Sequence, residues 1–420
     1  MKKVLIIGAG AQGGPCASIL ARDGDVSEVV LGDIDLDLAN RVREKIGSEK
    51  IRAVRLDASS IEDVQRAAEG AKAIINLTLT AFNSNIMKGA LASGCHYVDT
   101  SFGEPVLLDI RARDNILSQI IENRPLELDG EFKKAGLTAL VGCGKSPGMV
   151  NVLARYVCDR LNRVEEIRIR LCTKSLKGSR EVVRPWEPTW SPFRALWGYA
   201  VEPTIFEDGE YRKHPLFDGC EEYDFPDPVG RVMISYHQHQ EPITLPHFIG
   251  KGIRYCDFKY AVDPIAGALV KMGFGDPEAI EVGGVRVVPR DVLLKLVRQP
   301  VNAFLAENEE VVRRPLESAS FMVTDVAGLV SGERLNYTIT CPFCFPQVEE
   351  RMEVYRRFGT TLIGVALPAV VGAKMCMDGE AEKGVIAAEC LDAGNFLKRM
   401  ARMGGPVRFH ELCSRNVTVT

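Results

Sequence analysis

The sequence predicts an α/β protein: an N-terminal doubly wound parallel sheet, then a second α/β domain with a mixed or antiparallel sheet. Three observations lead to this prediction. Short runs rich in Val and Ile alternate with amphipathic segments over the first 145 residues. A glycine-rich turn follows the first of these runs. After residue 150 the alternating apolar runs become longer, which is typical of antiparallel strands.

The first domain is expected to consist of right-handed βαβ units, because strands and helices alternate along it. Strands are predicted at 3–10, 26–33, 51–57, 73–79, 96–101 and 137–144. Helices are predicted at 11–22, 36–46, 60–70 and 83–94, with further helical candidates at 105–122 and 127–135. Ser60, with Asp63 three residues later, is typical of a helix N-terminus.

The second domain is expected to contain longer strands and a long hairpin. The strands are predicted at 164–173, 230–238 and 253–262, and the hairpin over 316–341, turning at 328–332. Helices are predicted near 263–273, 290–306, 361–377 and 388–403, and a loop rich in aromatic residues and Pro at 185–230. We therefore divide the chain at 1–145, 146–375 and 376–420, the last being a helical segment that packs back on the core.

Composition narrows the possible partners. The chain has 420 residues, a net charge of −4 and a pI near 6.0, with no long basic run, which argues against nucleic acid or an anionic membrane. The apolar stretch 361–377 is shorter than the roughly 20 residues of a membrane span. Twelve cysteines without a regular framework indicate free thiols and a cytoplasmic protein. Cys341 and Cys344 form a lone CxxC, which is half a zinc site, so no metal is expected.

The first glycine-rich turn predicts a dinucleotide site of the Rossmann type. Residues 8–13 read GxGxxG between a strand and a helix, which is the context this pattern requires. Such glycines permit a tight turn and let backbone N–H groups approach a pyrophosphate. The cofactor is therefore expected to contact Gly8, Gly10, Ala11, Gln12 and Gly13.

The ends of the next strands complete the predicted cofactor site. Asp33 follows Gly13 by 20 residues, where a carboxylate accepts from the ribose 2′-OH and repels a 2′-phosphate. No Arg or Lys occurs at 34–40, so NAD is favoured over NADP. Further contacts with the cofactor are expected from four residues at or near strand ends: Ile34, Asp57, Ala58 and Thr78. A helix-capping role explains Asp57 and Ala58 nearly as well.

A second glycine-rich turn, GCGKSPGMVN at 142–151, resembles the end of a P-loop. However, Ala139 stands where a P-loop has its first glycine, and Pro147 removes an N–H from the turn. We predict instead a strand–turn–helix that faces the ligand cleft, with N–H groups, and in one interpretation Lys145, holding a substrate carboxylate.

Taken in order, the stretches VLIIGAGAQGGPCASIL, LDASS, GCHYVDTS and GCGKSPGMVN resemble the saccharopine dehydrogenase-like family. That family includes glutamate-forming saccharopine reductases, carboxynorspermidine dehydrogenases and lysine 6-dehydrogenases. The resemblance covers nearly the whole chain and is looser over 225–260. It implies an NAD(P)-binding domain, a second domain that forms the substrate pocket and often dimerises, and hydride transfer to or from a carbon bonded to nitrogen.

The resemblance also assigns roles to individual residues. The three glycines and Asp33 match the cofactor motif, and Lys88 matches a lysine that some members place near the reacting nitrogen. Pro147, Gly148 and Asn151 match a turn at the substrate cleft, to which Gly144 also belongs, whereas Lys145 departs from the family pattern.

Oxidation of an amine needs a base for its proton. The catalytic candidates are Lys88, Asp99 and His237, although Lys88 also fits a solvated helix face and Asp99 a structural acceptor. His96 lies near Asp99 at the same predicted strand. The segment 236–242 is expected to form a polar pocket wall through Tyr236, His237 and Glu241, with a His237–His239 metal site as the weaker alternative.

The sequence thus predicts an NAD-dependent oxidoreductase that acts on the C–N bond of an amino acid or an opine-like secondary amine, through an imine. The alternatives are a lysine 6-dehydrogenase that releases ammonia and a catalytically inactive NAD-sensing protein. The expected partners are a small-molecule substrate and a second copy of the chain, joined through the second domain.

Overall fold

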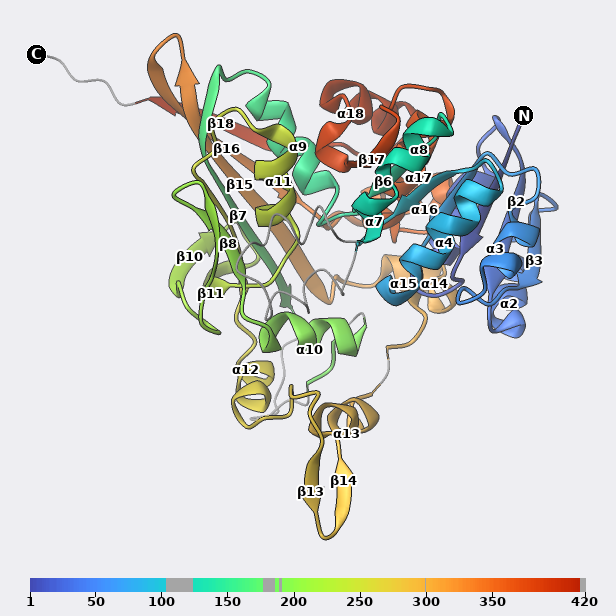
Figure 1. Cartoon of the computed structure of the whole chain (residues 1–420), viewed down its shortest axis with the longest axis horizontal. Helices are drawn as coiled ribbons and strands as arrows, with labels where there is room; N and C mark the ends of the chain where they lie inside the picture. The colour runs from blue at the N-terminus through green and yellow to red at the C-terminus, as the bar shows by residue number, and fades with distance from the viewer. Residues whose placement is uncertain (103–123, 177–185, 189–190, 299, 416–420) are drawn as a thin grey trace, which may run out of the picture. The chain divides into compact units, whose positions relative to one another are not determined.

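The computed structural model describes residues 1–102, 124–176, 186–188, 191–298 and 300–415 (Figure 1). The chain forms two compact units, each assembled from separate segments. The first contains Met1–Arg160, Asn302–Arg314 and Phe345–Arg408, and the second contains Leu161–Val301, Pro315–Cys344 and Phe409–Thr420. The helix predicted at 105–122 lies outside the described residues.

The first unit is built on a seven-stranded sheet in which every pair of neighbours is parallel. The strand order is β17-β6-β5-β4-β1-β2-β3, so the order reverses between β1 and β4, as in a doubly wound sheet. The strands are β1 (Lys2–Ile7), β2 (Val26–Asp33), β3 (Ile51–Arg55), β4 (Ala73–Asn76), β5 (His96–Asp99), β6 (Thr138–Val141) and β17 (Gly384–Ala387). The predicted parallel α/β fold of this part is confirmed.

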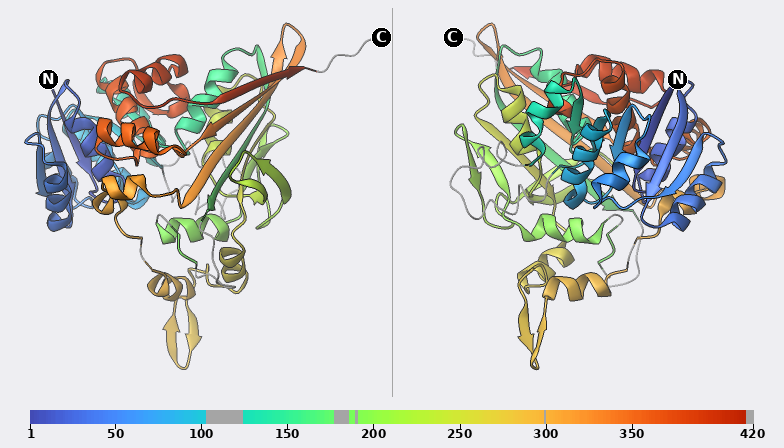
Figure 2. Two further views of the ribbon diagram at one scale, coloured as in Figure 1. Left: turned by 180° about the vertical axis from the view of Figure 1, so that it is seen from behind. Right: turned by 45° about the vertical axis from the view of Figure 1, so that its right-hand side comes forward.

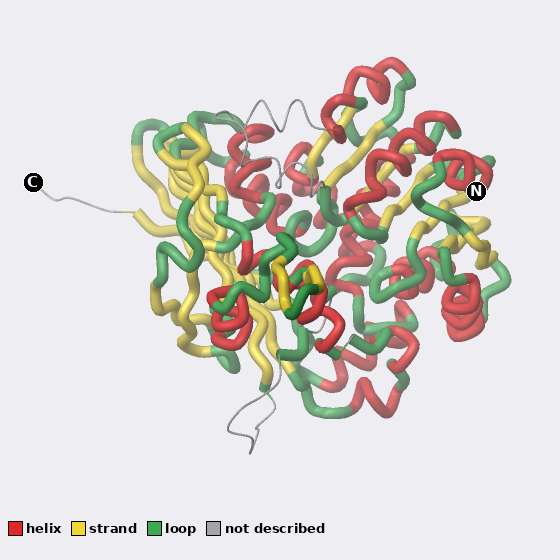
Figure 3. Tube along the Cα trace, turned by 60° about the horizontal axis from the view of Figure 1, so that its bottom comes forward, coloured by secondary structure: helices red, strands yellow, loops and turns green. Residues whose placement is uncertain are grey.

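Helices cover both faces of this sheet (Figures 1 and 3). The helices α1, α2 and α17 pack together on one face, and α3, α4 and α8 lie on the other. In the first half these are α1 (Gly13–Ala21), α2 (Leu36–Ile46), α3 (Ile61–Ala67), α4 (Asn83–Ala92), α7 (Arg124–Glu127), α8 (Asp129–Lys134) and α9 (Met149–Cys158). The later segments add α14 (Ala303–Ala306), α15 (Glu309–Arg313), α16 (Val348–Phe358), α17 (Ile363–Met377) and α18 (Ala393–Arg402). Short 3-10 turns are Thr80–Phe82 and Ala388–Cys390.

Helix α17 forms the centre of the first unit's core. It packs on α1, β4, β5 and β6, and twelve of its residues are buried, which explains why its apolar residues follow no single stripe. The buried helix predicted at 361–377 is therefore confirmed. The helix start predicted at Ser60 is confirmed as well, because the Ser60 side chain accepts from the backbone N–H of Asp63 at 3.1 Å.

The second unit is built on a mixed nine-stranded sheet, in which the β12–β7 pair is parallel and the other pairs are antiparallel. Figure 2 shows the long strands side by side. The strands are β7 (Arg163–Ser175), β8 (Thr204–Glu207), β9 (Glu210–Lys213), β10 (Glu221–Phe225), β11 (Gly230–Tyr236), β12 (Tyr255–Ala261), β15 (Ser318–Val330), β16 (Glu333–Pro342) and β18 (His410–Arg415). A separate hairpin joins β13 (Ile280–Val282) and β14 (Val285–Val287). The helices are α10 (Pro192–Ala200), α11 (Glu241–Ile249), α12 (Pro264–Lys271) and α13 (Pro289–Leu296).

The predicted long hairpin over 316–341 is confirmed as β15–β16. It turns at Ser331 and Gly332, which have φ angles of 51° and 87°, as a tight two-residue connection requires. Helices α10, α11 and α16 were not predicted. In α11, Pro242 and Pro246 resemble a loop signal, yet Pro242 occupies the first turn, where a missing N–H costs nothing.

Two further predictions differ from the structure. The helix expected near 290–306 consists of two helices, α13 and α14, separated by a break that includes Pro300. The tail was expected to be a helical segment, but Gly384–Ala387 forms the seventh strand of the first sheet by pairing with β6. The compact units therefore divide the chain differently from the expected segments, since residues 345–408 return to the first unit.

Among the described residues, no single helix is long and apolar enough to cross a membrane, although the bent pair α16 and α17 meets that criterion when both are counted together.

Candidate dinucleotide and substrate sites

The glycine-rich turn after β1 is shaped by two glycines that no other residue can replace. Gly8 has a φ of +102°, and a Cβ on it would lie 3.0 Å from the carbonyl oxygen of Leu77. A Cβ on Gly13 would lie 1.9 Å from the carbonyl oxygen of Gly8. These two glycines therefore close the turn on itself and on the end of β4.

The remaining residues of the turn leave room and hydrogen-bond donors for a ligand. A Cβ on Gly10 would meet nothing within 4 Å. Among the described residues, the N–H groups of Gly10, Ala11 and Gln12 have no hydrogen-bond partner, and the buried Gln12 Oε1 has none either. Open space beside donors at a helix N-terminus fits a pyrophosphate, so this turn suits a dinucleotide.

Asp33, at the end of β2, is tied to the glycine-rich turn. Its Oδ2 accepts from the backbone N–H of Ala9 at 2.7 Å, and its Oδ1 accepts from the N–H of Asp35 at 2.9 Å. Each carboxylate oxygen keeps a second lone pair, so Asp33 can still accept from a ribose hydroxyl. The next side chain, Ile34, is 55% exposed, which leaves an apolar surface beside this position.

The other predicted cofactor residues fall at the same edge of the sheet. Asp57 accepts from the N–H and hydroxyl of Ser59 at 2.9 and 2.6 Å, which forms a turn ahead of α3, and Ala58 is half-buried. The N-cap of α3 is Ser60, so Asp57 does not cap this helix. Thr78 donates to Asn76 Oδ1 from both its N–H and its hydroxyl, and its methyl group would lie 3.4 Å from a Cβ on Gly8. Thr78 therefore borders the glycine-rich turn.

Sequence reasoning missed Arg55 in this region. The pairing of β2 with β3 places Arg55 directly opposite Asp33, so both side chains lie on the same face of the sheet, and Arg55 is exposed. Arg55 follows Asp33 by 22 positions in the sequence, outside the range 34–40 that was searched for basic residues. Strand pairing, which the sequence does not display, was the missing signal.

A buried polar network lies at the ends of β4, β5 and β6, centred on Asp99. Its Oδ1 accepts from the N–H of Gly142 at 2.7 Å, and its Oδ2 accepts from the Tyr97 hydroxyl at 2.9 Å and Asn83 Nδ2 at 3.2 Å. Asn76 Nδ2 donates to both Asn83 and Tyr97, at 2.8 and 2.9 Å. Asp99 is 1% exposed, and burial raises its pKa to about 7.

This network favours the structural alternative for Asp99. The carboxylate joins the loop after β6 to the start of α4, and its described donors come from the protein itself. A catalytic partner has to contact the reacting atoms, which a side chain so fully enclosed does not reach in this arrangement. Asn76 and Asn83, which complete the network, carried no recognisable sequence signal.

In the second glycine-rich turn, several backbone N–H groups donate to acceptors within the turn itself. Gly144 N–H donates to Pro147 O at 3.0 Å, Met149 N–H to Gly144 O at 2.8 Å, and Gly148 N–H to Asn151 Oδ1 at 2.9 Å. These three N–H groups are therefore engaged within the turn in this structure, and contact between the turn and a substrate carboxylate stays a prediction. A P-loop presents such donors to phosphate, so the geometry also supports the rejection of a P-loop.

Asn151 and Lys145 have different surroundings in this turn. Asn151 is 1% exposed, and its Nδ2 donates to Oε2 of the buried Glu389 at 3.0 Å. Asn151 therefore fixes the start of α9 to the segment after β17. Lys145 is half-buried at the carboxyl edge of the parallel sheet, where ligands of such folds bind.

Lys88 and His96 lie apart from the buried network. Lys88 is exposed on α4, on the opposite side of the helix from the buried Asn83, Met87 and Ala90, which suits the solvated alternative. His96 begins β5, so it lies at the opposite edge of the sheet from Asp99, and its Nδ1 accepts from the N–H of Thr138 at 3.0 Å. Burial lowers the pKa of His96 to about 4.

In the second unit, Tyr236 belongs to a chain of polar groups on the mixed sheet. Its hydroxyl lies 3.0 Å from that of Tyr255, which donates to Asp257 Oδ2 at 3.0 Å. Asp257 is fully buried and forms a two-point ion pair with Arg170 at 2.7 and 3.2 Å. Tyr236 is half-buried at the end of this chain, where its ring also faces Lys259.

His237 and Glu241 are engaged with neighbouring side chains. The His237 ring packs edge-on against Tyr199, and burial lowers the pKa of His237 to about 3, so its imidazole is neutral. Glu241 is fully buried and forms a short contact with Nδ1 of His239, whose ring stacks on Phe258. Within the described ranges, no three His, Cys, Asp or Glu side chains come together as a metal site.

Comparison with known proteins agrees with this architecture. Residues 4–140 match the family model described as the saccharopine dehydrogenase NADP binding domain, and residues 144–405 match the saccharopine dehydrogenase C-terminal domain. The chain is 25% identical over 422 residues to carboxyaminopropylagmatine dehydrogenase of Synechocystis sp., covering 98% of each chain.

Two further proteins align over nearly the whole chain. Carboxynorspermidine synthase of Vibrio cholerae is 24% identical over 431 residues, covering 96% of this chain and 95% of its own. The structure of apo saccharopine dehydrogenase (L-Glu forming) from Saccharomyces cerevisiae superposes with a TM-score of 0.68 at 16% identity, covering 99% of this chain and 100% of that one. This last likeness concerns the fold.

Proposed function

The chain belongs to the saccharopine dehydrogenase family of oxidoreductases, and we propose that it acts with NAD on the C–N bond of a carboxylated secondary amine. The site that carries this proposal is the glycine-rich turn, because Gly10 borders open space and the N–H groups of Gly10, Ala11 and Gln12 have no described partner. When bound, the dinucleotide supplies or accepts the hydride.

The proposed choice of NAD rests on the charge around Asp33. Its carboxylate ends β2, and Asp35 and Asp37 follow within four residues, so a 2′-phosphate would meet a concentration of negative charge. The family model carries the name of an NADP-binding domain, and Arg55 lies opposite Asp33. In this proposal Asp33 repels the 2′-phosphate of NADP and Arg55 attracts it. We propose that the effect of Asp33 is the larger, so that the chain binds NAD in preference to NADP.

The proposed substrate class draws on the relatives that align over the whole chain. Their names describe carboxylated polyamines, in which an amine chain carries a carboxyl-bearing group. Lys145, half-buried at the carboxyl edge of the sheet, is the proposed partner of that carboxylate. Lys88 remains the proposed proton carrier from the family resemblance, and the substrate pocket is proposed to include Tyr236.

A turnover assay tests this function. The purified chain is given carboxynorspermidine, saccharopine and lysine in turn, with NAD⁺ and NADP⁺, and formation of the reduced dinucleotide is followed. We expect turnover with a carboxylated secondary amine and NAD⁺, and none with lysine. Ammonia released from lysine would support the lysine 6-dehydrogenase alternative. Dinucleotide binding without turnover of any amine would support the NAD-sensing alternative.

A further inference from the structure

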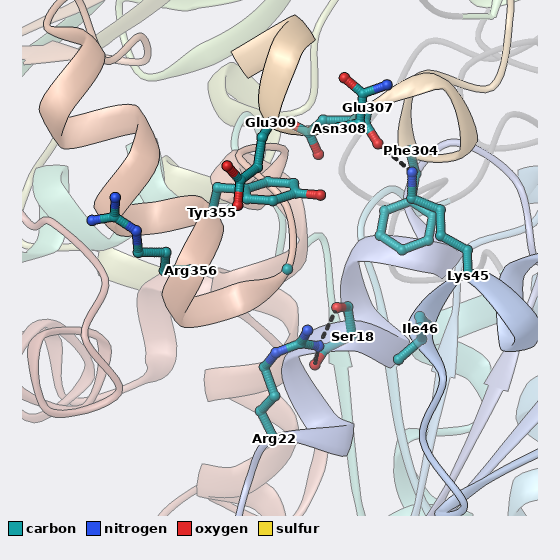
Figure 4. A pocket seen from close by; sticks show the side chains of 11 residues that line it. Ser18, Arg22, Lys45, Ile46, Phe304, Glu307, Asn308, Glu309, Tyr355 and Arg356 are labelled. Atoms are coloured by element: carbon teal, nitrogen blue, oxygen red, sulfur yellow. Dashed lines mark hydrogen bonds between the residues drawn. The ribbon is translucent and has the colours of Figure 1, made fainter. Parts of the chain in front are cut away.

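The first unit contains a cavity of about 330 Å³ at the other end of α1 from the glycine-rich turn (Figure 4). Helices of a parallel α/β sheet run antiparallel to the strands, so the C-terminal end of α1 lies at the amino edge of the sheet, away from the dinucleotide crevice. The lining residues come from α1, α2, the α14–α15 segment and α16. They include Ser18, Arg22, Lys45, Phe304, Glu309 and Tyr355.

Arg22 provides the cationic side of the cavity. One of its terminal nitrogens donates to the carbonyl oxygen and hydroxyl of Ser18 at 3.1 and 2.6 Å, which holds the guanidinium in place. Arg22 forms no ion pair with any described carboxylate. By contrast, Lys45 Nζ is bound by the carbonyl oxygens of Leu305 and Glu307. Arg356 also lines the cavity and has no described ion pair, but in Figure 4 its side chain points away from the other lining residues. Among the described lining cations, Arg22 is therefore the one best placed to receive an anionic group.

Glu309 provides the anionic side. It is exposed, and its described partner, Arg313, lies 3.8 Å away on the helix surface, where such a pair contributes little. The other acid of the segment, Glu307, already accepts from the Thr360 hydroxyl at 2.5 Å and the Thr361 N–H at 2.9 Å. In Figure 4 the side chains of Arg22 and Glu309 enter from different elements, with the Tyr355 ring beside Glu309.

The wall of the cavity also supports the glycine-rich turn. The Phe304 ring packs so closely on α1 that a Cβ on Gly14, the residue after the last glycine of the motif, would lie 2.3 Å from it. Two residues earlier, Asn302 Nδ2 donates to the carbonyl oxygen of Ala9 at 3.5 Å. A ligand that shifts the 302–309 segment therefore acts on the turn that receives the pyrophosphate.

We propose that this cavity is a regulatory site for a small zwitterion, with its carboxylate on Arg22 and its ammonium on Glu309, and that its occupancy alters dinucleotide affinity. The volume is at the lower end of the about 300–1,000 Å³ of small-molecule pockets, which suits a compact amino acid. Opposite charges on the lining favour a zwitterion over an anion or an amine alone. The coupling rests on the dinucleotide binding proposed above, whereas the zwitterion binding does not.

Calorimetric titration of the full chain tests the binding. The probes are β-alanine, γ-aminobutyrate and ε-aminocaproate, with butyrate and butylamine as single-charge controls. We expect at least one zwitterion to bind at least tenfold more tightly than both controls. Arg22→Gln and Glu309→Gln should each weaken that binding at least tenfold, while Arg41→Gln, an exposed residue of α2 outside the lining, should not change it. Equal binding of zwitterions and controls, no binding of any probe, or full binding to Arg22→Gln would overturn the site.

The coupling has its own measurement. The Kd of NADH and of NADPH is determined with and without the best zwitterion at saturation. We expect the zwitterion to change the Kd of the dinucleotide at least threefold in the natural chain. The Kd should not change in Phe304→Leu, which loses the ring that packs on Gly14 but keeps an apolar side chain. An unchanged Kd in the natural chain would overturn the coupling. A chain that binds the zwitterion yet turns over no amine would contradict the proposed function and leave this site intact.

Discussion

Oδ2 of Asp33 accepts a 2.7 Å hydrogen bond from the backbone N–H of Ala9. The residue expected to choose between NAD and NADP therefore also holds the turn that we propose for the pyrophosphate. The proposed role in cofactor choice and the observed support of the turn thus fall on a single side chain, and the two can be separated by substitution.

Asp33→Ala should lower stability more than Asp33→Asn, which keeps one of the two acceptor oxygens, and both should have the same effect on cofactor choice. Both remove the charge, so both should weaken the preference for NADH over NADPH by about 1–3 kcal/mol, measured by fluorescence titration. Asp33→Ala also strips the acceptor from the Ala9 and Asp35 N–H groups, so it should lower the free energy of unfolding by about 1–3 kcal/mol in a urea titration. An unchanged preference in both variants would contradict the role of Asp33.

Arg55→Gln should act on NADPH alone. Arg55 lies opposite Asp33 across the β2–β3 pairing and is the nearest basic residue of the paired strand to a ribose 2′-phosphate placed there. We expect the variant to weaken NADPH binding about tenfold, on the order of 1.4 kcal/mol, and to leave NADH binding unchanged. Arg52→Gln on the same strand, which pairs with Glu28, is the matched control. Equal losses for both cofactors would place Arg55 elsewhere in the site.

Asp99 should make the fold less stable as the pH rises. Burial raises its pKa to about 7 in the folded chain, while the unfolded value is near 3.8. Below about pH 4 both states hold the proton. Between about pH 4 and 7 the unfolded state loses it and the folded state keeps it, so the free energy of unfolding falls as the pH increases, by up to about 4 kcal/mol.

Denaturant titrations at pH 5 and pH 7 measure this contribution. Asp99→Asn cannot ionise, so the variant should lose the part of the pH dependence that Asp99 supplies. The new amide also faces the donor Nδ2 of Asn83, so the variant should be less stable at both pH values. This loss is the same at each pH and leaves the change of the free energy of unfolding with pH unaffected. The same slope in the natural chain and the variant would contradict a raised pKa of Asp99.

Lys145→Met and Asn151→Ala should separate substrate binding from the support of the turn. Lys145→Met should raise KM for a carboxylated substrate and leave NADH affinity unchanged, the mark of a lost substrate contact. Asn151→Ala removes the acceptor of Gly148 N–H and the donor to the buried Glu389, so it should destabilise the fold by about 1–3 kcal/mol. ATP binding that Lys145→Met abolishes would restore the P-loop interpretation.

Most strands of the first unit could be predicted from the sequence because the patterns that indicate them are local. The glycines at 8 and 13 and the alternating apolar runs each act within a few residues, and six of the seven parallel strands followed from them. The seventh, Gly384–Ala387, is four residues long and becomes a strand through pairing with β6. A segment that short carries little preference of its own.

The site was harder to predict because it depends on pairing and burial. The position of Arg55 opposite Asp33 depends on strand register. The enclosure of Asp99 requires Asn76 of β4 and Asn83 of α4 beside Tyr97, which shares β5 with Asp99. The N–H groups of the second turn looked available in the sequence, but Pro147 and Asn151 accept them once the turn closes.

The late position of β17 and α17 in the chain has a consequence for synthesis on the ribosome. Strand β6 is made early, yet the strand that covers its edge, and the helix that fills the core beneath it, emerge after nearly the whole second unit. Until then the nascent first unit exposes an unpaired strand edge and the apolar surface that α17 will cover, both of which favour aggregation. A chain truncated before α17 should therefore depend on chaperones that bind apolar surface, whereas the complete chain can bury that surface within itself.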